Sequence, residues 1–188
     1  MTSNFAETVL LIEVSLNLAK VSALTGSYRV DETYIKIKGR WYYLYRAVDS
    51  KCHTIDFMLS AKRDARAAKR FFRRMLKDVP DQVPRVINVD KNPAYPPAVE
   101  ELKAEAILSD DCQLRQCKYL NNLIEQDHRF IKRRVNPGLG FFSFKTAQRT
   151  IRGYEAIQMI RKGQVEGVGR ENIQGQARFV AQIFGVVA

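Results

Sequence analysis

The sequence lacks long apolar runs, and this absence restricts where the protein works. No segment reaches the roughly 18 consecutive apolar residues that a membrane-spanning helix needs. The start of the chain is fairly apolar, but Glu7 and Glu13 interrupt it and no basic stretch precedes it, so it is unlike a signal peptide. We therefore expect a cytoplasmic protein.

Cysteine and histidine are also scarce. The chain has 3 cysteines, Cys52, Cys112 and Cys117, with no C-x-x-C pair, and only 2 histidines. The spacing of Cys112 and Cys117 leaves a zinc site open as an alternative. Free buried thiols in a cytosolic protein are the favoured interpretation.

Acidic residues are outnumbered by basic ones. The 31 Lys and Arg residues face 20 Asp and Glu residues, which gives a net charge of +11, and a hydrophobic content of 46% is enough for a folded core. A protein this basic usually meets an anionic partner, and nucleic acid is the first candidate. The alternative is charge that serves only solubility. Phosphate contact and a solvated face are both open interpretations for one strongly basic stretch, which comprises Arg63, Arg66, Lys69, Arg70, Arg73, Arg74 and Lys77.

Hydrophobic periodicity predicts an alternation of strands and helices. The expected strands lie at 28–38, 41–49, 52–60, 85–89 and 106–108, and the expected helices at 64–77, 93–105, 119–135 and 143–162. Short turns make the first three strands an antiparallel meander, and the fourth, reached through a helix, is expected to be parallel to a neighbour. This order is that of an α/β, ribonuclease-H-like (retroviral-integrase-like) fold. Such a fold is a mixed five-stranded sheet flanked by helices, with the first strand central and the fourth beside it.

The predicted helix at 119–135 carries two distinct faces. Its apolar residues recur at helical spacing and predict a buried stripe: Leu120, Leu123, Ile124 and Ile131. A carboxylate, a histidine and two cations share a second face: Glu125, His128, Arg129 and Lys132. This second face fits a metal ligand presented next to an anionic polymer. A surface helix with ordinary ion pairs is the alternative.

Three carboxylates fall on three elements that the predicted fold brings together. Asp31 lies inside the first strand, Asp90 ends the fourth, and Glu125 lies on the late helix, with 34 residues (positions 91 to 124) between Asp90 and Glu125. Each acid alone also fits a plain role: a solvated strand acid, a turn former or a helix-surface acid. Converging carboxylates repel one another unless a divalent cation lies between them, and oxygen ligands suit Mg²⁺. Jointly, the three acids predict a two-metal phosphoryl-transfer site.

Four stretches of the sequence resemble a known family. These stretches are DETYIK at 31–36, GRWYYLYRAVD at 39–49, NVDKNPAY at 88–95 and YLNNLIEQDH at 119–128. They resemble the DDE transposases of bacterial insertion sequences, in the insertion-sequence-six (twenty-six-like) family. The similarity covers about residues 28 to 164.

The resemblance implies an activity, a cofactor and a set of residues. Asp31, Asp90 and Glu125 would be the catalytic triad and would bind Mg²⁺ or Mn²⁺, as two ions. The protein would cleave DNA and join it to a target during transposition, acting as an oligomer on the terminal inverted repeats of the element and on target DNA. Lys132, seven residues after the glutamate, would contact DNA, and we expect further DNA contacts from Arg129, His128, Arg133 and Lys91. For His128, a helix-surface hydrogen bond is an equally open interpretation.

The expected domain organisation has three parts. Residues 28–163 form the catalytic domain, 164–188 form a C-terminal tail whose first part is polar and Gly-rich, and 1–27 stand where relatives carry a longer helix-turn-helix region. On this reading the chain is truncated at its N-terminus. A second hypothesis follows, namely a catalytically silent DNA-binding remnant that joins full-length transposase. The protein is expected in a bacterial or archaeal cytoplasm, associated with the nucleoid.

Overall fold

The computed structural model describes residues 24–77, 83–117 and 122–183, which form two compact units. One unit runs from Leu24 to Ser143, and the described part of the other begins at Phe144. The prediction for residues 1–27 lies, up to residue 23, outside the described residues. The same holds for the first residues of the predicted helix at 119–135.

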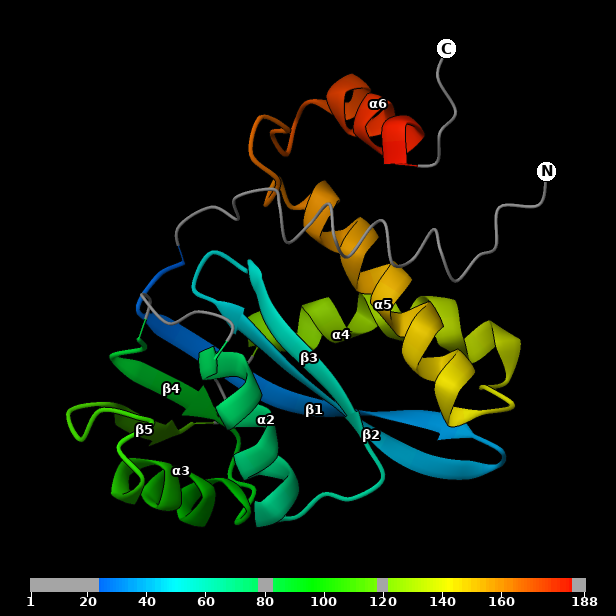
Figure 1. The fold of residues 1–188 in the computed structure, drawn as a ribbon. Coiled ribbons are helices and arrows are strands. Elements are labelled where there is room, and N and C mark those ends of the chain that lie inside the picture. The colour runs from blue at the N-terminus through cyan, green and yellow to red at the C-terminus, as the bar shows by residue number, and fades with distance from the viewer. Residues whose placement is uncertain (1–23, 78–82, 118–121, 184–188) are drawn as a thin grey trace. The chain divides into compact units, whose positions relative to one another are not determined.

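A five-stranded mixed sheet forms the centre of the first unit (Figure 1). Its strand order is β3-β2-β1-β4-β5. Strand β2 is antiparallel to both β1 and β3, and β4 is parallel to both β1 and β5. The strands are β1 (Ser27–Ile37), β2 (Arg40–Asp49), β3 (Thr54–Ser60), β4 (Val86–Val89) and β5 (Gln113–Gln116). The predicted meander, the central first strand and the adjacent fourth strand are confirmed.

The position predicted for the fifth strand is wrong. Residues 106–108 instead end the preceding helix: Ala106 adopts a left-handed φ of 55°, and the amides of Ile107 and Leu108 return to the Leu102 carbonyl. The true strand, Gln113–Gln116, is polar and largely exposed because it lies at the sheet edge and pairs with β4 alone. A polar edge strand carries little of the apolar pattern on which strand prediction depends.

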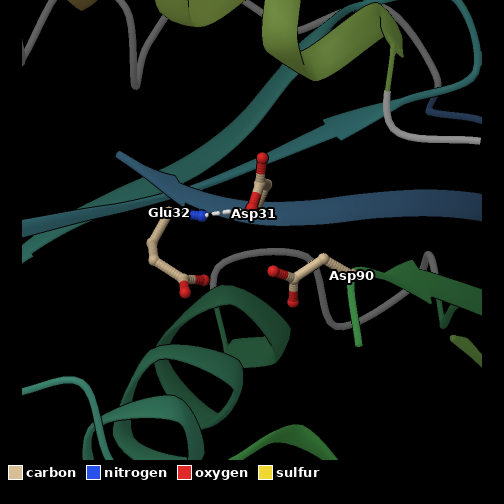
Figure 2. A group of neighbouring side chains, drawn as sticks. All are labelled: Asp31, Glu32 and Asp90. Carbon is tan, nitrogen blue, oxygen red and sulfur yellow. Dashed lines mark hydrogen bonds between the residues drawn. The ribbon is translucent and has the colours of Figure 1, made fainter. Parts of the chain in front are cut away.

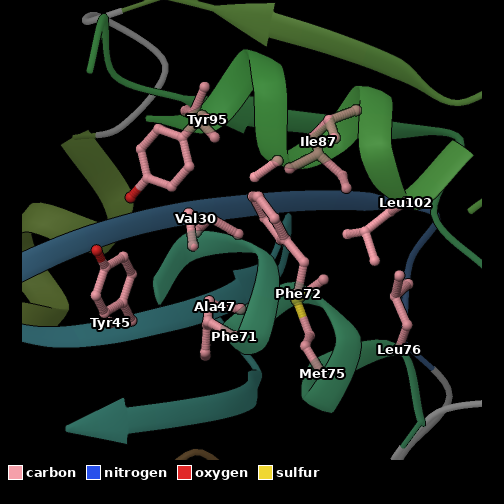
Figure 3. Packing of buried hydrophobic residues seen from close by; sticks show 14 of the residues in the cluster. Val30, Tyr45, Ala47, Phe71, Phe72, Met75, Leu76, Ile87, Tyr95 and Leu102 are labelled. Atoms are coloured by element: carbon pink, nitrogen blue, oxygen red, sulfur yellow. The ribbon is translucent and has the colours of Figure 1, made fainter. Parts of the chain in front are cut away.

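Helices α2 (Ala65–Lys77) and α3 (Tyr95–Ala104) cover one face of this sheet and build its main core with it (Figure 3). Phe72 packs against Tyr95, and Phe71 against Tyr45, with ring centroids 5.7 Å apart in each pair. Such aromatic contacts add to the large apolar area that the rings bury. Helix α4 (Asn122–Val135) contacts β1 and β2, and a short 3-10 turn, η2 (Asn136–Gly138), ends it.

The second unit contains helices α5 (Phe144–Arg161) and α6 (Ile173–Ile183). An apolar cluster joins the end of α5 to α6 through Ile160, Val165 and Phe179. Residues 164–188, predicted as the C-terminal tail, contain helix α6. The domain boundary at 163 stays a prediction. Among the described residues, none of the helices combines the length and apolar character needed to cross a bilayer.

Candidate active site

The pairing of β1 with β4 brings Asp31 and Asp90 to the same level of the sheet. Arg29 is the parallel partner of Asn88, so two further residues along each strand lead to Asp31 and Asp90. Strand β4 ends at Val89, which releases Asp90 at the carboxyl edge. Ligands of open α/β sheets bind at such strand ends.

Helix α4 adds the third predicted carboxylate to the same place. Asp31, Asp90 and Glu125 all line one pocket of about 440 Å³. Its remaining lining residues are Arg63, Lys91, Asn92 and Pro93. The structure thus brings together the three acids predicted from the sequence and adds two cations to them.

A fourth carboxylate lies close to two of these acids. One oxygen each of Asp31, Glu32 and Asp90 lies within 4.8 Å of the others, and these three form the sole group of potential metal-binding side chains of that kind in the described part of the chain. Figure 2 shows Asp31 and Glu32 leaving β1 in opposite directions, because neighbouring strand residues point to opposite faces. Asp31 faces the pocket, whereas Glu32 does not line it.

Glu32 is surrounded by donors on the side of α2 and α3. Its buried carboxylate accepts hydrogen bonds from Arg63 Nε, from Tyr95 Oη and, at 2.9 Å, from Asn92 Nδ2. Burial, reinforced by the charge of Glu32, raises the pKa of Tyr95 well above its usual value, so the phenol keeps its donor proton. Partial burial lowers the pKa of Arg63, but its bond to Glu32 outweighs that effect and raises the pKa overall. No role was predicted for Glu32 from the sequence.

Helix α4 does not present all the polar residues of its predicted second face to solvent. Glu125, Arg129, Lys132 and Arg133 are exposed, but His128 is only 4% exposed. The Nε2 atom of His128 lies 3.3 Å from Asp31 Oδ2. The His128 side chain is thus buried against a pocket carboxylate, and its contact with DNA stays an untested prediction.

A buried ion pair fixes α4 to the sheet. Arg46 Nη2 donates to Asp127 Oδ2 at 2.6 Å, and the two side chains are 0% and 6% exposed. Arg46 is the cross-strand partner of Asp31, so the pair lies beside the pocket. Arg46 was not predicted as a functional residue, because it lies in the nearly continuous apolar sequence of β2. Asp127, two residues after Glu125, does not line the pocket.

Most cations of the basic stretch at 63–77 already have acidic or hydroxyl partners. Lys69 and Arg73 pair with Glu105 of α3, and Arg74 pairs with Asp56 of β3. Arg63 binds Glu32, and Arg70 donates to Ser60 Oγ. These pairs join α2 to its neighbours and leave fewer cations of the stretch available to bind phosphate. Phosphate contact by this stretch stays an untested prediction.

The donor chemistry of the pocket fits a hard divalent cation. Asp31 and Asp90 supply carboxylate oxygens at close range, and Glu125 offers a third carboxylate from the pocket wall. Mg²⁺ and Mn²⁺ prefer such oxygen ligands, and they are usually held by a few carboxylates together with water and phosphate oxygens. Arg63 and Lys91 would face an anionic substrate in the same pocket.

Comparison with known proteins places most of the chain in one family. The sequence model of a family described as a DDE domain matches residues 25–164. The transposase for insertion sequence-like element IS431mec of Staphylococcus aureus strain N315 is 42% identical over 135 residues, which are 72% of this chain and 58% of the relative. The transposase for insertion sequence element IS257 in transposon Tn4003 of S. aureus matches with the same identity and coverage. The chain thus spans 58% of the length of these curated relatives.

A solved structure supports the fold. The catalytic core domain of HTLV-2 integrase, in complex with magnesium, superposes with a TM-score of 0.54 at 18% identity. The match covers 80% of this chain and 96% of that one. It confirms the predicted ribonuclease-H-like, integrase-like fold, and at this identity it shows the fold alone.

Proposed function

The chain belongs to the DDE transposase domain family, and on that premise we propose that it is the catalytic domain of an insertion-sequence transposase. Its reactions would be metal-dependent DNA strand cleavage and transfer of the freed 3′-hydroxyl to target DNA. The observation that carries this proposal is one pocket lined by Asp31, Asp90 and Glu125 from β1, the end of β4 and α4.

The pocket residues would have two roles in phosphoryl transfer, metal binding and phosphate binding. Asp31, Asp90 and Glu125 would hold Mg²⁺ or Mn²⁺, proposed as two ions. When bound, such ions activate the attacking oxygen and stabilise the leaving one. The HTLV-2 integrase core was solved with magnesium, which supports this choice of metal. Arg63 and Lys91, on the pocket wall, would hold the scissile phosphate by charge-assisted hydrogen bonds.

Exposed cations of α4 would guide the DNA backbone to this pocket. Arg129, Lys132 and Arg133 follow Glu125 along the helix and are exposed, as is Lys91 beside Asp90. Cations in such a row neutralise phosphates without reading sequence. The partners would be the element's ends and target DNA. Because both element ends must be processed, we propose at least a dimer on DNA, in the bacterial cytoplasm.

The test of this proposal is strand cleavage by the purified protein. With Mg²⁺ or Mn²⁺ it should nick or join labelled duplexes taken from the DNA that flanks its gene. Asp90→Asn should reduce this to background, because the amide removes one charged ligand from the pocket. Asp110→Asn, an exposed acid outside the pocket, should leave the activity unchanged.

Two outcomes would contradict the proposal. Cleavage that persists in Asp90→Asn would show that the pocket is not the reaction site. Salt-sensitive DNA binding by the wild-type chain without strand breakage in either metal would favour the alternative of a silent DNA-binding remnant.

A further inference from the structure

Glu32 of β1 joins two other segments of the first unit at one buried carboxylate. Arg63 lies between β3 and α2, Asn92 lies between β4 and α3, and Tyr95 begins α3. All three donate to Glu32, whose side chain is 1% exposed. The Tyr95 ring is itself locked in the core, with its hydroxyl directed out of the apolar cluster (Figure 3).

Two of these residues also hold the pocket carboxylate Asp90, through other N–H groups. The backbone amide of Asn92 donates to Asp90 Oδ1 at 2.9 Å, and Arg63 Nη2 lies 3.4 Å from Asp90 Oδ2. The backbone amide of Glu32 donates to Asp31 Oδ1 at 2.9 Å (Figure 2). Residue 32 is therefore linked to both aspartates, directly to Asp31 and through Asn92 and Arg63 to Asp90.

Glu32 is poorly suited to bind the metal itself, although its oxygen lies within 4.8 Å of both aspartates. A carboxylate has about four acceptor positions, and three donors already occupy three of those of Glu32. The side chain also leaves β1 on the face opposite Asp31 (Figure 2). Glu125, by contrast, is exposed and lines the pocket.

We propose that Glu32 is a positioning residue that holds Asp90 and Arg63 in place around the metal site. The inference rests on the proposed function, since it assigns Glu32 a task at that same pocket. Groups that hydrogen-bond behind metal ligands fix ligand orientation, and their loss typically weakens metal binding 10- to 100-fold. A neutral amide at position 32 keeps the size of the side chain, but it points an N–H group at donors and removes the carboxylate that binds Arg63 Nε.

The test measures metal binding apart from catalysis. In the full chain, Mn²⁺ binding followed by electron paramagnetic resonance should be about tenfold weaker in Glu32→Gln than in wild type. Glu105→Gln is the matched control, because Glu105 also links α2 to α3 by ion pairs, with Lys69 and Arg73, but lies outside the pocket. It should keep the wild-type Kd for Mn²⁺.

The possible results separate this inference from the proposed function. Wild-type protein that binds no Mn²⁺ contradicts both. Wild-type affinity in folded Glu32→Gln, or an equal loss in Glu105→Gln, overturns the role of Glu32 alone. If Glu32→Gln does not fold, Tyr95→Phe tests the role of Glu32 instead, since it keeps the core ring and removes one donor to Glu32. Weaker Mn²⁺ binding is expected there, and an unchanged Kd overturns the inference.

Discussion

At the scale of single residues, α4 separates side chains that helical spacing alone places together. His128 and Lys132 are one turn apart, yet His128 is buried near Asp31 while Lys132 is exposed. The buried stripe of the helix includes two polar residues, Asp127 and His128, beside the apolar Ile124 and Ile131. A polar residue on a buried stripe acts within the protein, whereas an exposed cation is available to DNA.

Lys132 and His128 are therefore expected to behave differently in DNA binding. Lys132→Ala should weaken binding to duplex DNA of any sequence and reduce the slope of log affinity against log salt by about 1, because one phosphate contact is lost. His128→Phe should leave that slope unchanged, since a buried ring neutralises no phosphate. Fluorescence anisotropy of labelled duplex DNA, over a series of salt concentrations and with a metal chelator present to prevent cleavage, measures the slope for both variants. Equal slopes for Lys132→Ala and wild type would contradict the proposed contact.

At the scale of elements, the Arg46–Asp127 pair determines how α4 sits on β2. Asp127→Asn leaves the guanidinium of a fully buried arginine without its carboxylate, which should cost about 3–5 kcal/mol of unfolding free energy. The double variant Arg46→Met with Asp127→Leu removes both charges and should regain most of that loss. Urea denaturation measures all three proteins. A double variant no more stable than Asp127→Asn would mean that the pair contributes through something other than compensated charge.

The elements also show what the sequence was able to predict. β1 to β4 and α2 to α4 follow from strong periodic patterns, and the three pocket acids follow from the strand and helix that carry them. The edge strand β5 was misplaced because its QLRQ sequence has almost no apolar pattern. The contacts of Glu32 and Arg46 lay beyond prediction, since their partners are 31 to 81 positions away and become neighbours only in the folded sheet.

At the scale of the whole molecule, the net charge is +11, and the basic residues of different helices have different surroundings. Many cations of α2 are used to join α2 with α3 and β3, whereas the exposed cations of α4 lie beside the acidic pocket. A basic surface next to clustered carboxylates draws a polyanion toward a site that would otherwise repel it. The basic residues thus have two roles. Those of α2 stabilise packing within the first unit, and those of α4 would attract the proposed DNA substrate.

Buried tyrosines are expected to lower the stability of the first unit at alkaline pH. Burial, helped by the charge of Asp49, raises the pKa of Tyr28 from 10.0 to about 12, and burial raises the pKa of Tyr45 and of Tyr95 as well. A group whose pKa is raised on folding contributes its full stability below its unfolded pKa and loses it as the pH rises through the folded value. Unfolding free energy should therefore hold up to about pH 10 and then fall by about 3 kcal/mol toward pH 12 from Tyr28 alone.

Urea midpoints measured from neutral pH upward test this expectation. Tyr28→Phe has no proton to lose at this position, so its midpoint should fall less steeply above pH 10 than that of the wild type. The comparison of slopes matters more than the absolute midpoints, because the substitution also removes a hydroxyl. A wild-type midpoint that stays constant to pH 12, or that falls as steeply in Tyr28→Phe, would show that Tyr28 ionises as easily in the folded chain as in the unfolded one.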